Sequence, residues 1–463
     1  METRVTDKAA QAESEIGDSL RERLTQTDIA ELQSDFAANP SYRLMQNAVA
    51  QYDVNEIALD RSVVTAASHS YSNVLDSWSP TDQGNTGRCW LFAGLNLFRV
   101  DTMKALNVKQ FEFSQNYAMF WDKVERANFL LESIISTADR PVDDRTVAWL
   151  MEAPLEDAGQ WDMFVGLVKK HGVVPKTAMP ETESSGNTHR MNSILYNVVR
   201  QGAKDIRDLY ADEAGIDAMR QAKRETLKVV YRVLCIHLGT PPSRFDWQWT
   251  DKDGQFHRDG EITPLEFAEK YVSTPVDEYV CLVNDPRKTS PMGRTYAIDF
   301  LGNVVGSPSV KYLNIDIELM KEITLRLLLE EKPVWMGCDV GKQMHRKLGM
   351  WDAQLFDYAG VYGTEFTLDK AGRLDYGQTQ MTHAMLFTGV DVVDGRARRW
   401  RVENSYGEAL GDKGFCMMND SWFNEYMFEI AAPKSYLPED LQRALDTEPI
   451  LLPPWDPMGA LAS

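Results

Sequence analysis

A cysteine, a histidine and an asparagine stand in local settings that suit nucleophilic catalysis. Cys89 follows a loop rich in Ser, Pro, Asp, Asn, Thr and Gly, and an apolar run over residues 90–100 begins directly after it. This pattern predicts that Cys89 opens a helix, where the helix dipole favours the thiolate over the thiol. Because the thiolate is the nucleophilic form of cysteine, Cys89 is the predicted nucleophile.

A thiolate cannot protonate a leaving amine, so amide hydrolysis by Cys89 requires an acid nearby in space. Of the seven histidines, His383 opens an apolar strand that is followed by a hairpin return. The pair Asp394-Gly395 is a strong signal for the hairpin turn. A hairpin folded there brings Asn404 beside His383, where the amide of Asn404 can hold the orientation of the imidazole.

The loop before the cysteine offers donors for a developing oxyanion. Gln83 precedes Cys89 in the segment Gln-Gly-Asn-Thr-Gly-Arg-Cys-Trp, whose glycines allow the backbone to approach a substrate closely. The side-chain amide of Gln83 and the backbone N–H of Cys89 are the predicted oxyanion hole. Losing one such donor typically costs about 3 to 4 kcal/mol of transition-state stabilisation.

Composition describes a large globular protein without a disulfide framework. The chain has 463 residues, of which 43% are hydrophobic and 10% aromatic, enough for two or three domains or one elaborated domain. Its five cysteines are scattered, with no CxxC or Cys/His cluster, so neither disulfides nor a zinc site are expected. Thiol-based hydrolysis needs no metal or organic cofactor.

Charge and hydropathy bear on partners and location. A formal net charge of −20 opposes binding to nucleic acid, which depends on the neutralisation of phosphates by Lys and Arg. No stretch approaches the roughly 18 to 20 apolar residues of a membrane helix, and residues 1–15 lack the hydrophobic core of a secretion signal. We therefore expect a cytoplasmic protein that binds neither membrane nor nucleic acid.

Periodicity indicates that helices precede strands along the chain. A helical arm over residues 29–49, interrupted at Asn39-Pro40, is followed by a long helical region over 191–237 and a helix over 315–331. Residues 334–340, 384–393 and 399–402 are predicted strands. The order favours an α+β fold whose two layers supply the nucleophile and the base separately.

Taken in order, Q-x5-C-W, T-H-A and E-N-S-Y-G resemble the signature of the papain-like cysteine peptidases. Each motif alone is weak, because Cys89 alone suits a buried inert thiol, His383 a core histidine and Asn404 a turn. Within this superfamily the chain resembles the bleomycin hydrolase and aminopeptidase C group most closely. The segments that carry this resemblance are residues 83–92, 159–163, 172–176, 335–342 and 454–462.

The resemblance implies a papain-like fold with a helical layer carrying Cys89, an antiparallel β layer carrying His383 and Asn404, and large helical insertions. The separation of Cys89 from His383 far exceeds the roughly 130 to 150 residues of compact relatives, which agrees with insertions. The implied organisation places an N-terminal arm and helical half in 1–190 and a helical, oligomerising insertion in 191–310. The β half then occupies 311–450, and 451–463 form a tail docked in the cleft.

The resemblance also implies a cysteine aminopeptidase that acts on peptides with a free N-terminus and assembles as a homohexamer around an internal cavity. Its C-terminal tail would lie in the cleft and meet the substrate amino group with a terminal carboxylate from Ser463 or, after trimming, Ala462. Gly159 and Gln160 would pair with the substrate backbone, although Ala158 replaces the glycine that relatives carry. Tyr406 takes the place of a tryptophan that shields the Asn–His pair.

Three other functions compete with this interpretation. An endopeptidase of the same fold would need a cleft that is open on both sides of the bond. A papain-fold module that binds or assembles, such as a nucleic-acid-binding ring, is disfavoured by the intact triad and the acidic charge. A transglutaminase-like Cys-His-Asp enzyme also proceeds through a thioester, but Asn404 and the tail motif disfavour it.

Overall fold

The computed structural model describes residues 22–75 and 78–462 of the chain. The chain divides into two compact units: the described residues up to Thr65 together with Phe356–Thr367, and the remainder. In the part of the chain that the structure describes, no helix combines the length and the apolar character needed to span a bilayer.

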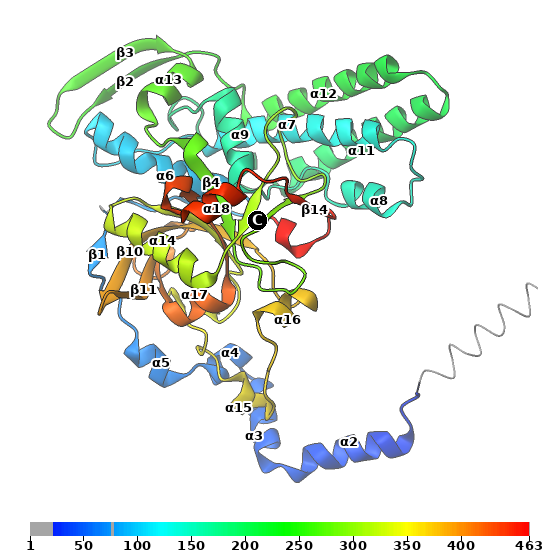
Figure 1. Cartoon of the computed structure of the whole chain (residues 1–463), viewed down its shortest axis with the longest axis vertical. Helices are drawn as coiled ribbons and strands as arrows, with labels where there is room; N and C mark the ends of the chain where they lie inside the picture. The colour runs from blue at the N-terminus through cyan, green and yellow to red at the C-terminus, as the bar shows by residue number, and fades with distance from the viewer. Residues whose placement is uncertain (1–21, 76–77, 463) are drawn as a thin grey trace, which may run out of the picture. The chain divides into compact units, whose positions relative to one another are not determined.

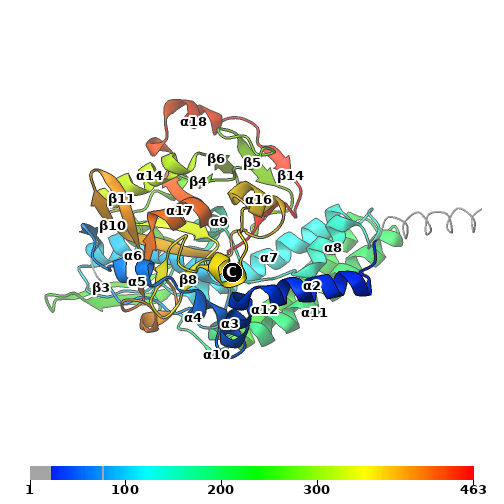
Figure 2. The same cartoon turned by 90° about the horizontal axis from the view of Figure 1, so that it is seen from below.

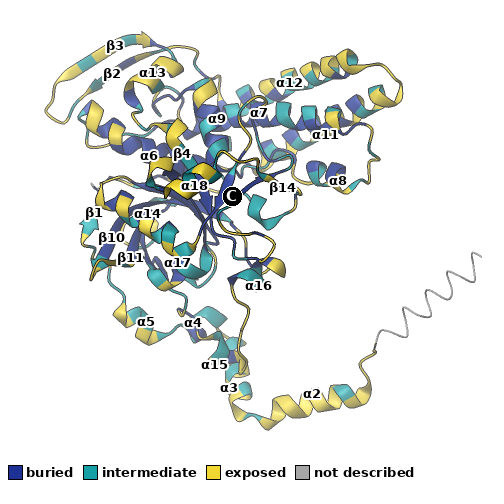
Figure 3. Ribbon diagram, viewed as in Figure 1, coloured by how far each residue is buried: buried dark blue, intermediate teal, exposed yellow. Residues whose placement is uncertain are grey.

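The smaller unit consists of short helices. The predicted break at Asn39-Pro40 is confirmed, because the Asn39 side chain caps one helix and Pro40 occupies its first position. Few of its side chains are buried, and Figure 3 shows α2 mostly exposed. The helices are α2 (Gln26–Ala38), α3 (Pro40–Val49), α4 (Val54–Ala58), α5 (Arg61–Ala66) and α15 (Tyr358–Tyr362).

The larger unit begins with a helical layer. The predicted helical region over 191–237 forms two helices, α11 and α12, which run side by side in Figures 1 and 2 and contact α7. Gly215, at φ +83°, opens the second of them. The helices of this layer are α6 (Cys89–Leu106), α7 (Gln115–Ser136), α8 (Arg145–Glu152), α9 (Trp161–His171), α10 (Glu183–Gly186), α11 (His189–Ala211) and α12 (Ile216–Leu238).

The expectation of helix throughout 191–310 is wrong for its second half. Alternating aromatic residues form a hairpin there, in which Trp247 and Trp249 stack at 5.5 Å and Trp247 packs edge-on against Phe267. These aromatic residues fit a pleated surface better than a helix, and this favours strand. The elements are β2 (Phe245–Thr250), β3 (Phe256–Ile262), α13 (Pro264–Tyr271), β4 (Tyr279–Val283) and β5 (Thr295–Ile298).

A large sheet forms the second layer, and the strands predicted near 334–340, 384–393 and 399–402 all belong to it. Its strand order is β14-β5-β6-β4-β13-β7-β10-β11-β12-β9-β8, with β1 paired to β10. The strands not yet named are β1 (Asn73–Val74), β6 (Tyr312–Asn314), β7 (Val334–Cys338), β8 (Met344–His345), β9 (Met350–Trp351), β10 (His383–Val393), β11 (Arg396–Glu403), β12 (Phe415–Asn419), β13 (Met427–Pro433) and β14 (Ile450–Leu452).

Strand β10 is buried on both faces, which explains its nearly continuous apolar sequence. Ala384 and Leu386 belong to the core cluster shared with the helical layer. Met385 and Phe387 point to the opposite face, where they join a second cluster with α14 (Ile317–Leu329) and α17 (Asp420–Tyr426). The remaining helices of this layer are α16 (Lys370–Asp375) and α18 (Glu439–Ala444).

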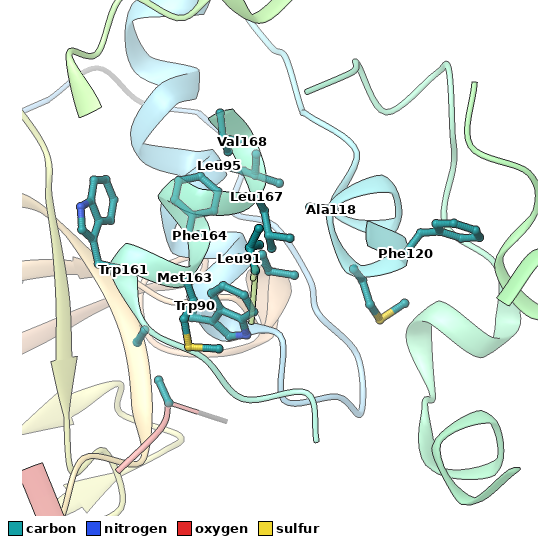
Figure 4. Close-up of a cluster of buried hydrophobic side chains, with 14 of the residues drawn as sticks. Trp90, Leu91, Leu95, Ala118, Phe120, Trp161, Met163, Phe164, Leu167 and Val168 are labelled. Carbon is teal, nitrogen blue, oxygen red and sulfur yellow. The ribbon is translucent and has the colours of Figure 1, made fainter. Parts of the chain in front are cut away.

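The helix that carries Cys89 is held by packing on one side. Figure 4 shows Trp90, Leu91 and Leu95 of α6 gathered with Phe164 and Leu167 of α9. These side chains are almost fully buried. The position of the N-terminus of α6 is therefore set by an apolar cluster as well as by its loop.

Polar contacts join the same helix to the sheet. The carboxylate of Glu403, at the end of β11, is buried and forms an ion pair with Arg99 of α6. It also accepts hydrogen bonds from the Asn96 amide at 3.0 Å and from the Trp78 indole N–H at 2.7 Å. Because Asn404 follows Glu403 directly, this network connects the helix of the cysteine to the strand of the asparagine.

The substitution Glu403→Gln tests this connection. It leaves the Arg99 charge buried without its counter-ion, so we expect the free energy of unfolding to fall by about 3 to 5 kcal/mol. Chemical unfolding followed by tryptophan fluorescence measures the change. Glu225→Gln, which breaks an exposed pair with Lys228, is the matched control and should change stability little. Equal effects of the two substitutions would contradict the network's role.

Candidate active site

The loop before Cys89 is tightly constrained. Gly84 adopts φ +64°, and a Cβ there would lie 2.5 Å from the carbonyl oxygen of Gly186. The guanidinium of Arg88 is buried and pairs with Glu181 at 3.0 Å. Only glycine therefore fits at position 84. The ion pair with Glu181 fixes Arg88, the residue directly before the nucleophile. Cys89 is the first residue of α6, as the sequence predicts.

Cys89 is fully buried, and its environment differs from the expected one. The backbone N–H of Ala384 donates to Cys89 Sγ with an N···S distance of 3.3 Å. Burial raises the pKa of the Cys89 thiol to about 12, although backbone N–H groups of Ala384, Trp90 and Cys89 itself act in the opposite direction. The N–H groups at the helix N-terminus therefore favour the thiolate, as expected from the sequence, but desolvation outweighs them.

His383 and Asn404 meet as predicted. The hairpin turn at Asp394-Gly395 has positive φ at both residues, and the strands it joins pair Leu386 with Glu403. The Nε2 atom of His383 lies 3.0 Å from Asn404 Oδ1. The backbone N–H of Ser405 donates to the same Oδ1 at 2.8 Å.

That second bond determines the proton position on the imidazole. Because a backbone N–H from Ser405 faces the Asn404 amide oxygen, the oxygen and not the nitrogen is directed at the ring. The Nε2 of His383 must therefore carry a hydrogen, which makes Nδ1 the atom that exchanges protons in the neutral ring. The ring of Tyr406 stacks on His383 at 5.4 Å with an interplanar angle of 6°, so it covers one face of the imidazole.

Gln83 is buried beside this pair. Its side-chain oxygen accepts from Ser405 Oγ at 2.5 Å, and its amide nitrogen donates to the carbonyl oxygen of Thr86. These bonds hold the amide in one orientation and use one of its two N–H hydrogens. The second hydrogen is the one that an oxyanion would use, and that role stays a prediction.

The segment predicted to pair with extended chains holds the C-terminal tail. Gly159 N–H donates to Ala462 O at 3.0 Å, and Ala462 N–H donates to Gly159 O at 3.2 Å. The side-chain amide of Gln160 donates to Ala460 O at 2.8 Å. The structure therefore brings Gly159, Gln160 and Ala462 together, whereas Ser463 lies outside the described residues.

Trp90 links this segment to the nucleophile. A Cβ at Gly159 would lie 2.3 Å from the Trp90 ring, so the backbone of residue 159 rests directly on the indole. The indole N–H donates to the carbonyl oxygen of Asp157 at 2.6 Å. Trp90 therefore belongs to the core and also supports the backbone segment that pairs with the tail.

The Asp157 carboxylate is a functional group that sequence reasoning missed. It pairs with the fully buried Lys123 at 2.6 Å and accepts from Asn192 at 2.9 Å, from Thr188 and from the Gly87 N–H at 3.3 Å. Burial alone would raise the pKa of Asp157, but Lys123 and these donors hold it below its usual range. No local pattern marks this residue, because its partners come from three distant segments.

A polar depression of about 620 Å³ opens beside the nucleophile loop. Its walls include Gly87, Asp157 and the first turns of α11, among them Asn192 and Tyr196. Since Gly87 lies two residues before Cys89, the depression has room for a substrate side chain near the nucleophile. The polar walls offer hydrogen-bonding partners to such a side chain.

A buried thiol at a helix N-terminus, with an imidazole and an amide on the facing strands, defines a cysteine peptidase of papain-like architecture. The chain matches the model of the Peptidase C1-like family over residues 23–459. It belongs to that family.

Individual relatives are similar over nearly the whole chain. The chain is 40% identical to "Bleomycin hydrolase" of Rattus norvegicus, covering 95% of this chain and 99% of that protein. It is 37% identical to "Aminopeptidase C" of Lactobacillus delbrueckii subsp. lactis, covering 94% and 97%. The crystal structure of PepW from Lactobacillus rhamnosis HN001 superposes with a TM-score of 0.93 at 40% identity, covering 95% and 99%.

The raised pKa of the thiol leads to a prediction about His383→Ala. Without an imidazolium to stabilise the thiolate, we expect alkylation of Cys89 by iodoacetamide to require a pH well above that at which an exposed thiol reacts, because burial raises the pKa of Cys89. The wild type should react well below that pH. Alkylation rates across a pH series, with Cys89→Ala as the blank, measure this.

His69→Ala, which removes an exposed histidine, is the matched control and should retain the wild-type profile. An unchanged pH profile in His383→Ala would show that the imidazole does not stabilise the thiolate.

Proposed function

We propose that the protein is a cysteine aminopeptidase that removes residues from the N-terminus of peptides, with its own C-terminal tail limiting access to the cleft. The observation that carries this proposal is the two-way backbone pairing of Ala462 with Gly159. Gly159 rests on Trp90, the residue next to Cys89, and this contact supports a tail that fills the cleft on one side of the nucleophile. A substrate then has room for one residue on that side.

In the proposed reaction the Cys89 proton passes to His383 Nδ1, which gives a thiolate and an imidazolium. The thiolate attacks the carbonyl carbon of the first peptide bond, and the resulting oxyanion accepts hydrogen bonds from the Cys89 N–H and the Gln83 amide. His383 then donates its proton to the leaving amine as the C–N bond breaks. An acyl-thioester on Cys89 and a shortened peptide result.

Hydrolysis of the thioester completes the cycle. His383 takes a proton from water, the hydroxide adds to the thioester carbonyl, and the C–S bond breaks to release a free amino acid. Asn404 acts by holding Nε2–H, which keeps Nδ1 directed at the reacting groups. Tyr406 shields the Asn404–His383 bond from water, which would weaken it.

The tail carboxylate is the proposed partner of the substrate amino group. Ala462 is the residue paired with Gly159, and it is the last residue that the structure describes. We propose that Ser463 is removed and that the carboxylate of Ala462 meets the α-amino group. The names "Bleomycin hydrolase" and "Aminopeptidase C" of the relatives support peptidase activity of this kind.

Paired fluorogenic substrates test the proposal, one with a free α-amino group and one with a blocked N-terminus. We expect the wild type to cleave only the free-amine substrate, Cys89→Ala to cleave neither, and a variant lacking residues 460–463 to cleave both. The physical reason is that deletion removes the chain paired with Gly159 and opens the cleft. Intact masses of the purified wild type and Cys89→Ala report whether Ser463 is removed by Cys89.

Two outcomes would replace the proposal. If the wild type cleaves the blocked substrate equally well, the protein is an endopeptidase and the tail does not limit access. If neither substrate is cleaved under reducing conditions, a papain-fold binding or assembly module becomes the better hypothesis.

We also propose a cytoplasmic homohexamer, as the family resemblance implies. Apolar side chains of Leu32, Phe36 and Leu44 on α2 and α3 are exposed, and a second copy of the chain would bury them. Replacing all three by Ser should shift the mass found by light scattering from a hexamer to a smaller species. A monomeric wild type would refute this part of the proposal.

A further inference from the structure

The tail reaches the cleft from a fixed point at the edge of the sheet. Strand β14 pairs in parallel with β5, so residues up to Leu452 are anchored by backbone hydrogen bonds. The tail then turns through the short 3-10 helix η4 (Pro457–Gly459) before Ala462 pairs with Gly159. This part of the chain is drawn in red in Figure 1. The direction in which η4 leaves the sheet therefore decides whether the tail reaches the cleft.

A largely buried ion pair holds that turn. Arg287, in the loop after β4, bonds to Asp456 with Nη2···Oδ1 at 2.7 Å and Nη1···Oδ2 at 3.4 Å. The exposed fractions of the two side chains are 8% and 14%. Arg287 also pairs with Asp285 at 2.6 Å, so one guanidinium serves two carboxylates. An ion pair with this degree of burial is screened by salt much less than a surface pair.

Asp456 also shapes the turn itself. Its Oδ1 accepts a hydrogen bond from the Met458 N–H at 2.9 Å and so caps the start of η4. Gly459 is pressed against β5, because a Cβ there would lie 2.9 Å from a side-chain carbon of Ile298. One carboxylate therefore both begins the turn and attaches it to the body of the protein.

The other contacts of the tail are partly exposed or lie within the cleft. Leu461 packs against the core but stays only partly buried, and it lines a cavity of about 260 Å³. Trp455 stacks under Arg145 at 3.7 Å but remains 37% exposed. The Gln160 and Gly159 hydrogen bonds form only when the tail already lies in the cleft. The ion pair is thus a largely buried charged contact that attaches the tail to the body of the protein outside the cleft.

We propose that the Arg287–Asp456 ion pair is a latch that determines exopeptidase specificity. With the latch formed, η4 directs the tail into the cleft and only chains with a free α-amino group bind productively. With the latch broken, the tail leaves Gly159 and longer, N-blocked chains enter. This inference rests on the proposed aminopeptidase function, and both residues are positioning residues that touch neither substrate nor reacting atoms.

The substitution Asp456→Asn tests the latch with little disturbance. Asparagine retains an oxygen that can cap Met458 N–H, and Arg287 keeps Asp285 as its counter-ion, so no buried charge is left alone. We expect cleavage of the N-blocked substrate to rise at least about tenfold over the wild type. For the free-amine substrate we expect KM to rise and kcat to stay unchanged, since the catalytic groups are untouched.

Two further variants separate the ion pair from other effects. Asp456→Glu keeps the charge within reach of Arg287, and it should retain the wild-type preference for a free amino group. Asp277→Asn removes the same charge from an exposed pair with Lys169 and should behave as the wild type. Thermal unfolding of each variant establishes that it is folded before the substrates are compared.

The variant lacking residues 460–463 distinguishes failure of the latch from failure of the proposed function. If the deletion opens the cleft to the blocked substrate and folded Asp456→Asn does not, the latch is overturned while the tail keeps its role. If the deletion leaves the blocked substrate uncleaved, the tail does not limit access and both ideas are overturned. Cleavage of the blocked substrate by both variants supports the latch.

Discussion

The site depends on one buried carboxylate, that of Glu403, which joins the two layers of the larger unit. Its three donors come from α6 and from the segment before it, while the carboxylate itself ends β11. A buried charge is tolerated only when it is paired and hydrogen-bonded. This contact therefore restricts the position of α6 relative to β11. The helix carries Cys89 and the strand leads into Asn404. The contact therefore constrains the position of Cys89 relative to Asn404, the residue that orients the base.

Burial of the Cys89 thiol disfavours its charged form, and neighbouring groups must offset this effect for a thiolate to form. Desolvation raises the pKa of Cys89, while the helix N-terminus and the Ala384 N–H act against it without prevailing. A charged imidazole is the remaining means of stabilising a thiolate in such an environment. The hydrogen bonds of Asn404 to His383 and Ser405 make this possible, since they place the ring hydrogen on Nε2 and so make Nδ1 the atom that exchanges the proton.

The tail and the nucleophile share a support. The backbone carbonyl of Asp157 binds the Trp90 indole, and its carboxylate binds the Gly87 N–H and Lys123. Two residues later, Gly159 pairs with Ala462. A displacement of this segment would therefore move both the loop before Cys89 and the docking position of the tail, which couples reactivity to the choice of substrate.

Several features follow from sequence by itself, because they depend on local patterns. The helix that begins at Cys89, the hairpin turn at Asp394-Gly395 and the pairing of His383 with Asn404 are set by apolar periodicity and turn chemistry. The ordered motifs also indicated the family, which the comparisons confirm. Local pattern is weaker between β2 and β5, where the resemblance implies a helical insertion and the structure has short strands.

Other features were decided only by tertiary structure, because they join residues that are distant along the chain. The pKa of Cys89 is raised by burial between the two layers. The position of Cys89 at a helix N-terminus predicts a shift in the opposite direction, so the sequence could not give the sign of the shift. The Asp157 network, the Glu403–Arg99 pair and the Arg287–Asp456 pair each match a charge with partners from separate segments. The sequence supplies the charged side chains, but only the folded chain decides which of them are buried next to one another. Those that are buried must be paired, because an unpaired buried charge is costly.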